Sequence, residues 1–215
     1  EITNLQQAIA YLGVKQIRNL AMTAAVSELV CDSATIGSYS RSGLWRHVVS
    51  VGIAARLIAM RRNMPDFEDI YLAGLLHDIG IILEDQYCHS RFCGVLGSLR
   101  IEQTLCQNER VHLGFDHTQL GREVARLWGF PDAVQAGIAH HHSMAAYRGP
   151  FAEQVRCVEV ANLLCTLKGI TSIGLKLVKT SLPSIKQLGL SREDLAILAE
   201  DLDCELAKTV QMFNL

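Results

Sequence analysis

Residues 72–83 read LAGLLHDIGIIL and place a histidine directly before an aspartate inside an otherwise apolar run. The apolar residues on both sides predict that His77 and Asp78 are buried. A buried polar pair costs several kcal/mol unless its atoms find hydrogen bonds or a metal ion. We therefore expect other polar side chains of the chain to meet His77 and Asp78 in the core.

Composition limits the classes of protein and of partner. The 215 residues carry 20 Lys and Arg against 22 Asp and Glu, with no basic block, so no nucleic-acid partner is expected. The seven cysteines form no CxxC pair and occupy apolar positions such as Cys157 and Cys165, which indicates reduced thiols and a cytoplasmic protein. No uncharged run approaches the roughly 20 apolar residues of a membrane span, so no membrane partner is expected.

Apolar periodicity predicts helices along nearly the whole chain and no strand. Thr3 with Gln6 predicts a capping box for the first helix, and Asp116 or Thr118 a cap for a later one. Pro65 is expected to begin the helix that carries His77. Without a low-complexity linker, residues 1–215 are predicted to form a single compact all-α domain. The expected helices are 5–13, 14–30, 44–62, one continuing from Pro65 through His77 and Asp78, 88–107, 118–130, 132–142, 152–168 and 192–213.

Several histidines fall on apolar helix faces or at helix ends, whereas His89 and His112 lie in polar surroundings and look incidental. A lone histidine in a core is usually a hydrogen-bonded structural residue. Imidazoles that share a bundle core with a carboxylate can instead bind a divalent Fe, Mn, Zn, Ni or Co ion. Taken together, the inward or helix-end polar residues favour such a metal site, for which the candidate ligands are His47, His77, Asp78, His117, His141 and His142.

Four motifs resemble the HDOD domain, a relative of the HD-type metal-dependent phosphohydrolases that include the HD-GYP phosphodiesterases. They are LWRHVVSVGIAARLIA at 44–59, YLAGLLHDIGIIL at 71–83, FDHTQLGREVARLWGFP at 115–131 and GIAHHH at 137–142. The resemblance implies a multi-helix HD-superfamily bundle in which the six candidate ligands match the metal-binding positions. It also implies that the chain is the C-terminal, HD-like part of the domain, without the N-terminal helices that HDOD domains usually have.

Two residues depart from the pattern of the phosphodiesterases. Ile81 stands where those enzymes have a lysine, which removes a cation that could stabilise charge on a phosphate. Asn162 stands where the family's closing aspartate ligand is expected, and a neutral amide is a weaker ligand than a carboxylate. Glu159, on the same helix face, is a substitute carboxylate, although a solvent-facing or ion-paired role is favoured for it.

The residues Ile81 and Asn162 decide which hypothesis for the function is favoured. The resemblance and the departures favour a non-catalytic regulatory or output domain in bacterial signal transduction, derived from a metal-dependent phosphohydrolase. Its expected partners are signalling protein domains, and a nucleotide or phosphate ligand fits its ancestry. An active metal-dependent phosphohydrolase or phosphodiesterase is the alternative, since fold alone does not transmit activity. A purely structural helical scaffold is disfavoured, because so many buried polar groups would be costly to fold.

Overall fold

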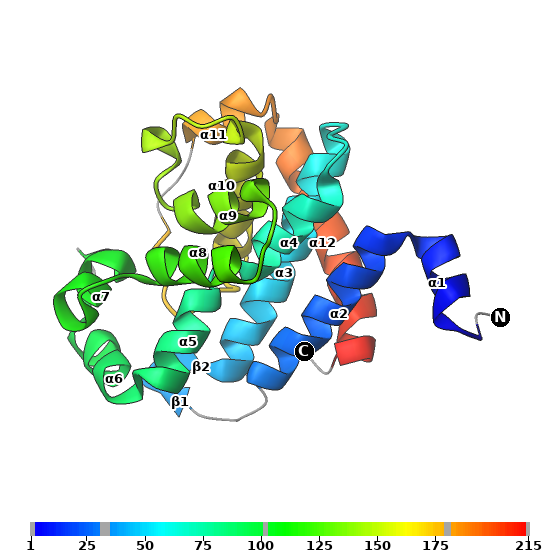
Figure 1. Cartoon of the computed structure of the whole chain (residues 1–215). Coiled ribbons are helices and arrows are strands. Elements are labelled where there is room, and N and C mark those ends of the chain that lie inside the picture. The colour runs from blue at the N-terminus through cyan, green and yellow to red at the C-terminus, as the bar shows by residue number, and fades with distance from the viewer. Residues whose placement is uncertain (1–2, 31–34, 101–102, 179–181, 214–215) are drawn as a thin grey trace.

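The computed structural model describes residues 3–30, 35–100, 103–178 and 182–213, and it confirms the all-α prediction (Figure 1). The central helix is α3, Arg41–Arg61, which packs against α4 (Phe67–Leu76), α10 (Ala152–Leu167) and α12 (Arg192–Phe213). Next to this core, α9 (Asp132–His140) contacts α4 and α8 (His117–Leu127), and α8 contacts α5 (Ile79–Tyr87). The predicted metal ligands therefore lie on helices that pack against one another.

The remaining described elements are peripheral to this core. A two-residue antiparallel ladder in the turn-rich segment before α3 corrects the expectation of no strand at all, because Thr35 pairs with Ser40 and Ile36 with Tyr39. The short helix α11 was not predicted either. These elements are α1 (Leu5–Leu12), α2 (Val14–Leu29), β1 (Thr35–Ile36), β2 (Tyr39–Ser40), α6 (His89–Ser98), α7 (Leu105–Leu113), the 3-10 turn η1 (Met144–Ala146) and α11 (Leu182–Gln187).

Helix α3 is apolar because it crosses the centre of the molecule. It is long and apolar enough to cross a membrane by length and composition alone, but 72% of its most apolar window is buried inside the protein. Leu44, Val48 and Val51 are completely buried along it. Burial of an all-round apolar helix among its neighbours is the usual arrangement at the centre of a bundle.

The His-Asp pair lies at a break between two helices, not within one. Helix α4 ends at Leu76 and α5 begins at Ile79. His77 is the C-cap residue of α4, and Asp78 is the N-cap residue of α5. The prediction of one continuous helix from Pro65 was therefore wrong. The apolar run is continuous through the break because both helices are buried, so periodicity could not reveal it.

Two other sequence predictions need correction at helix boundaries. The expected helix at 88–107 is two separate helices, α6 and α7, and the second begins with a capping box from Thr104. The first helix is capped by Asn4, whose side chain accepts a hydrogen bond from the Gln7 backbone, and not by Thr3. The cap at Asp116 is as predicted, and Ser191 with Asp194 forms hydrogen bonds at the start of α12.

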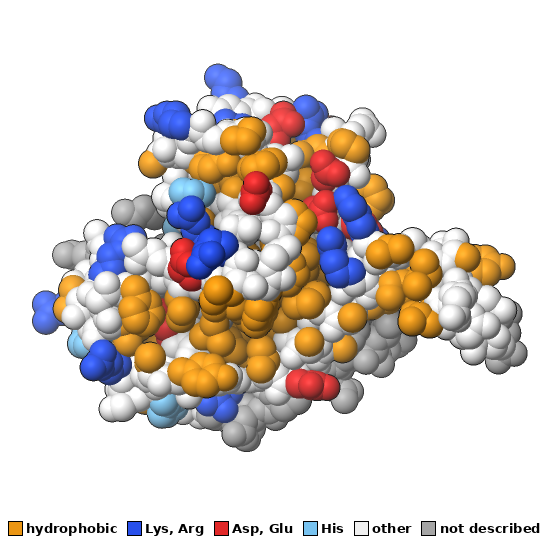
Figure 2. Space-filling model, in the orientation of Figure 1, with side chains coloured by type: hydrophobic (Ala, Val, Ile, Leu, Met, Phe, Trp, Pro, Cys, Tyr) orange, Lys and Arg blue, Asp and Glu red, His pale blue; other side chains and the backbone are white. Residues whose placement is uncertain are grey.

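The N-terminal helix α1 contacts α2 and projects away from the rest of the molecule (Figure 1). None of its residues is buried, and hydrophobic side chains are visible on this protruding end in Figure 2. Leu5, Tyr11 and the following Val14 are all exposed. Trp128, which follows α8, is also exposed.

Candidate metal centre

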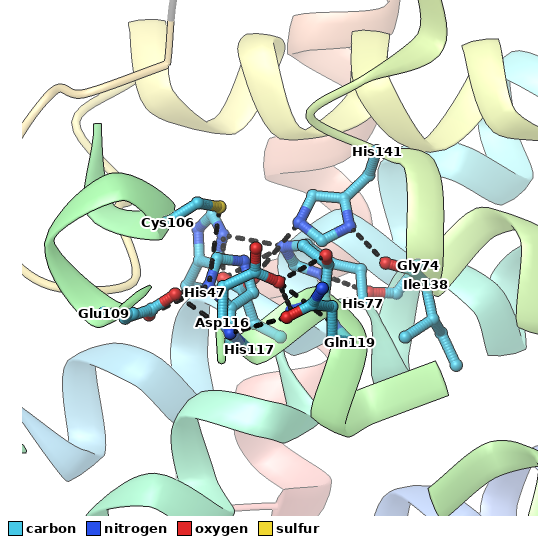
Figure 3. Close-up of polar contacts among 12 residues, drawn as sticks. His47, Gly74, His77, Cys106, Glu109, Asp116, His117, Gln119, Ile138 and His141 are labelled. Atoms are coloured by element: carbon cyan, nitrogen blue, oxygen red, sulfur yellow. Dashed lines mark hydrogen bonds and ion pairs between the residues drawn. The ribbon is translucent and has the colours of Figure 1, made fainter. Parts of the chain in front are cut away.

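Histidine rings from separate helices surround Asp78. Figure 3 shows the rings of His47, His77, His117 and His141 lying close together. Oδ2 of Asp78 lies 3.1 Å from Nε2 of His77 and 3.5 Å from Nε2 of His47 on α3. Its Oδ1 lies 3.4 Å from Nε2 of His117, the first residue of α8, and 3.4 Å from Nε2 of His141, which follows α9. Four imidazole nitrogens thus point toward one carboxylate.

His142 completes the cluster beside His141. Its ring centroid lies 4.1 Å from that of His141 and 5.2 Å from that of His117. Potential ligand atoms of Asp78, His117, His141 and His142 lie within 4.8 Å of one another, as do those of His47, His77 and Asp78. The structure thus gathers all six residues that the sequence predicted as ligands, and their role in binding a metal remains a prediction.

The other nitrogen of each buried ring is held by a hydrogen-bond acceptor. The Nδ1 of His47 donates to the Ile170 carbonyl at 3.0 Å, and that of His77 to the Gly74 carbonyl at 2.7 Å. The Nδ1 of His141 donates to the Ile138 carbonyl at 2.8 Å. A carbonyl only accepts, so Nδ1 of each ring must carry a proton, and in the neutral imidazole Nε2 is left with its lone pair.

These lone pairs face one another across the centre. The Nε2 atoms of His47 and His77 are 3.3 Å apart, and an imidazole that carries its only proton on Nδ1 has no hydrogen to place between them. Burial, followed by the neighbouring His77, lowers the pKa of His47 to about 4, and burial likewise lowers that of His141 to about 4. Both rings are therefore neutral near pH 7, and a cation between the lone pairs would remove their repulsion.

Buried polar atoms without partners point in the same direction. Oδ1 of Asp78 and Nε2 of both His117 and His141 are buried and make no hydrogen bond. Burial alone would raise the pKa of Asp78, but His77 and His141 hold it well below its usual value, so the carboxyl is an anion. One carboxylate with several imidazole Nε2 atoms is a donor set that fits a divalent transition metal.

Glu109 on α7 orients His117. Its carboxylate accepts from Nδ1 of His117 at 2.8 Å and from the His117 backbone N–H at 3.0 Å. Burial would lower the pKa of His117, but Glu109 and Cys106 raise it well above its usual value. A carboxylate on the outer nitrogen of a histidine is the usual support of a metal-binding ring, because it fixes the orientation and increases basicity.

Glycines allow α8 to approach α5 and α9 closely enough to build the centre. A Cβ on Gly80 would lie 2.1 Å from the His117 carbonyl oxygen, and one on Gly121 would lie 2.9 Å from Cγ2 of Ile138. Asp116 begins α8 by accepting from the backbone N–H groups of Thr118 and Gln119. Gly80, two residues after Asp78, is therefore needed to bring His117 to the centre.

The two departures from the phosphodiesterase pattern are both buried. Ile81 is completely buried in the apolar core. Asn162 lies on α10, which packs against α3, α4 and α9, and its Oδ1 is buried without a hydrogen-bond partner. Glu159 on α10 accepts a hydrogen bond from Ser184 on α11, so its carboxylate already has a partner.

Sequence reasoning missed the acidic residues behind His117. Glu109 and Glu84 are both completely buried, yet Glu109 sits among polar residues in the sequence and Glu84 is followed by Asp85 and Gln86, and a glutamate is usually expected to face solvent. The spacing of Glu109 eight residues before His117 follows no single helix face, because a turn separates α7 from α8. His89 and His112, taken as incidental, contact Asp85 and Ser98 and lie outside the cluster.

The family model of the HDOD domain matches residues 1–144 of this chain. No functionally curated protein matches the sequence. Among solved structures, an HDOD domain protein of unknown function from Geobacter sulfurreducens is 27% identical with a TM-score of 0.77, and the match covers 99% of this chain and 74% of that one.

Two further solved structures share the fold at lower identity. A protein from Marinobacter aquaeolei VT8, provisionally described as a signal transduction protein, is 24% identical with a TM-score of 0.81; the match covers 100% of this chain but only 48% of that protein. A protein from Shewanella amazonensis SB2B, provisionally described as a phosphohydrolase, is 20% identical with a TM-score of 0.73, with 100% and 77% covered. At these identities the likeness establishes the fold alone.

Proposed function

Because the chain belongs to the HDOD domain family, we propose that it is a regulatory domain of bacterial signal transduction that binds a divalent metal ion and does not hydrolyse phosphodiesters. The ion would be held by His47, His77, Asp78, His117, His141 and His142. In hydrolytic relatives such an ion supplies Lewis acidity and activates a bound water. In this chain the same residues would use it to hold the surrounding helices together.

The observation that carries the metal proposal is the orientation of the rings. Carbonyl oxygens fix Nδ1–H on His47, His77 and His141, so their lone pairs point at the Asp78 carboxylate. Structural histidines in a core normally pair a donor with an acceptor. Here lone pairs and an anion meet with too few protons between them, an arrangement that a dication would stabilise.

The non-catalytic part of the proposal rests on what surrounds this cluster. Ile81 supplies no charge to a transferring phosphoryl group, and Asn162 supplies no closing carboxylate. His77 and His117 are completely buried, and Asp78 is only 2% exposed, so a phosphodiester could reach an ion there only if helices moved apart. Both transition-state stabilisation and substrate access are therefore weakened.

The signalling part of the proposal is supported by the family and by the Marinobacter structure, which is provisionally described as a signal transduction protein. The proposed partners are protein domains of a signalling pathway, and a nucleotide or phosphate ligand remains a candidate because of the phosphohydrolase ancestry. A metal centre that joins α3, α5, α8 and α9 could couple its occupancy to the surface that such a partner contacts.

Metal content and thermal stability test the proposal. Protein purified without added metal should contain about one equivalent of a transition metal per chain, and chelation should lower its melting temperature. The variant His77→Ala should lose both the metal and the response to chelator, whereas His112→Ala should keep them, because His112 bonds to Ser98 away from the centre. Wild-type protein that neither contains nor binds metal would refute the proposal.

An active phosphohydrolase is the second candidate, and the observation in its favour is that all six candidate ligands come together. Hydrolysis of bis(4-nitrophenyl) phosphate, measured with Mn²⁺, Fe²⁺ or Zn²⁺ supplied separately, distinguishes the two. Turnover that is sensitive to chelator and lost in His77→Ala would favour the enzyme. Metal binding without turnover would support the regulatory domain.

A further inference from the structure

A cysteine, a histidine and a buried aspartate meet where α5 is followed by α6, outside the candidate metal centre. Nε2 of His89 lies 3.6 Å from Sγ of Cys93, and Nδ1 of the same ring lies 2.8 Å from Oδ1 of Asp85. His89 and Cys93 are four residues apart on α6 and so share one face of that helix. The imidazole therefore lies between a thiol and a carboxylate, as the base does beside an activated nucleophile.

Asp85 fixes the tautomer of His89. Its carboxylate and its backbone carbonyl, whose oxygen is 3.2 Å away, both accept from Nδ1. Burial opposes the ionisation of Asp85, but hydrogen bonds from Arg41 and Tyr39 keep its pKa below the usual value, so the carboxyl is an anion with no proton to donate. Nδ1 must therefore carry the proton, and Nε2 of the neutral ring keeps its lone pair for the thiol.

The pair stands on a well-packed helix but is open to solvent. Phe92 on α6 is completely buried, and its ring packs edge-on against that of Tyr39 with the centroids 5.2 Å apart. Helix α6 packs against α5 and α7 at the edge of the molecule (Figure 1). The His89 side chain is 52% exposed and Cys93 is partly exposed, so a small reagent can approach them without a movement of helices.

Other cysteines of the chain have different surroundings. Burial raises the pKa of Cys157 to about 12 and also raises that of Cys165, so both thiols stay protonated near neutral pH. Cys106 approaches Nδ1 of His117, a nitrogen that already donates to a carboxylate. Cys204 on α12 is exposed, with no hydrogen bond to a histidine among the described residues. Cys204 therefore serves as the reference for an exposed thiol without a base.

We propose that Cys93 is a modification site that reacts with low-molecular-weight disulfides, such as glutathione disulfide, by thiol–disulfide exchange. His89 accepts the thiol proton at Nε2, and the sulfur of Cys93 attacks one sulfur of the reagent. A bond forms between these two sulfurs, the disulfide bond of the reagent breaks, and the leaving thiolate takes the proton from His89. Asp85 is a positioning residue that stabilises the imidazolium between the two proton transfers. Cys93 is oxidised to the mixed disulfide, the departing half of the reagent is reduced to a thiol, and no other oxidant takes part.

Site-resolved rates of modification in the whole chain test the proposal independently of the metal centre. Protein held in chelator is treated with glutathione disulfide near neutral pH, and each cysteine is quantified by peptide mass spectrometry. Cys93 should react about tenfold faster than Cys204. His89→Gln, which removes the base, should lower the rate at Cys93 by about the same factor and leave Cys204 unchanged. His112→Gln is the matched control and should leave both rates unchanged, because His112 bonds to Ser98.

The tautomer of His89 gives a test that needs no substitution. Side-chain nitrogen chemical shifts from NMR of metal-free protein should place the proton on Nδ1. A proton on Nε2 would leave the thiol without an acceptor and overturn the proposal. Equal rates at Cys93 and Cys204 in wild-type protein, or an unchanged rate at Cys93 in folded His89→Gln, would also overturn it. If His89→Gln does not fold, the two wild-type measurements decide.

Discussion

Asp78 and Asp85 lie at the two ends of α5, and both are 2% exposed, but their surroundings are opposite. Asp85 receives hydrogen bonds from the Tyr39 hydroxyl at 2.8 Å, Arg41 Nε at 2.6 Å and His89 Nδ1 at 2.8 Å. Asp78 meets imidazole Nε2 atoms, and its Oδ1 makes no hydrogen bond. The two carboxylates are therefore equally buried, but only Asp85 is surrounded by hydrogen-bond donors.

The difference shows how a structural carboxylate can be told from a candidate ligand. The pKa of both groups is lowered: burial opposes ionisation in each, and it is overcome by His77 at Asp78 and by Arg41 at Asp85. The direction of the pKa shift therefore does not separate them. The number of donors does, because Asp85 has its lone pairs satisfied by protein and Asp78 has lone pairs left for an ion.

Removing each charge in turn should give the largest contrast. Asp85→Asn should lower the free energy of unfolding by about 3 kcal/mol, because it removes the buried anion that accepts from Tyr39, Arg41 and His89. Asp78→Asn should cost metal-free protein less than about 1 kcal/mol, since it removes an anion whose oxygens are poorly satisfied. Urea denaturation in the presence of chelator measures both. Equal losses would show that the two carboxylates are both structural.

Metal saturation should reverse that order. At a free metal concentration of about 100 times Kd, an ion bound only by the folded state adds about 2.7 kcal/mol to the free energy of unfolding. Wild-type protein and Asp85→Asn should both gain this amount, and Asp78→Asn should gain none. Thermal or urea unfolding with Mn²⁺ or Zn²⁺ against chelator provides the measurement. A gain that survives Asp78→Asn would place the ion elsewhere in the molecule.

Much of this contrast could be predicted from the sequence. His47 and His77 stand out as polar residues on apolar faces, and the motif resemblance assigned Asp78 correctly to the cluster. Asp85 could not be distinguished from a solvent-facing residue, because its donors Tyr39 on β2 and Arg41 at the start of α3 come from distant sequence. Hydrogen-bond donors supplied by tertiary contacts leave no local pattern.

The same reason explains the errors in the fold. The break at His77 is hidden in a continuous apolar run, and the division of 88–107 depends on how α6 and α7 pack. Helix existence was predicted well where the apolar pattern continues over many residues, as in α2, α3 and α10. Glu109 was missed because the polar residues around it predict exposure, and Glu84 because it stands where the apolar run of α5 gives way to Asp85 and Gln86. Tertiary burial of short, polar segments is the part that the sequence does not encode locally.

A smaller effect is expected from restoring a carboxylate at Asn162. Its Oδ1 is buried without a partner, so Asn162→Asp adds charge where an unsatisfied oxygen already lies. If this position borders the metal site, affinity for Mn²⁺ or Fe²⁺ should rise by about tenfold, measured by titration calorimetry. Glu159→Gln is the control and should leave affinity unchanged, because Glu159 is engaged by Ser184. Weaker binding in Asn162→Asp would show that the added anion is merely buried.

The smallest effect concerns acid, and its sign follows from the lowered pKa of Asp85. A carboxyl whose pKa is lower in the folded than in the unfolded state stabilises the protein above its unfolded pKa of about 3.9, and this contribution is lost as the pH falls through the folded value. The difference in unfolding free energy between wild type and Asp85→Asn should therefore be constant near neutral pH and shrink below about pH 4. Urea denaturation at several pH values, with chelator present to keep the metal centre out of the comparison, measures this difference. If the difference in unfolding free energy instead grew on acidification, the folded protein would favour the neutral form of Asp85. The donors around Asp85 would then not stabilise an anion.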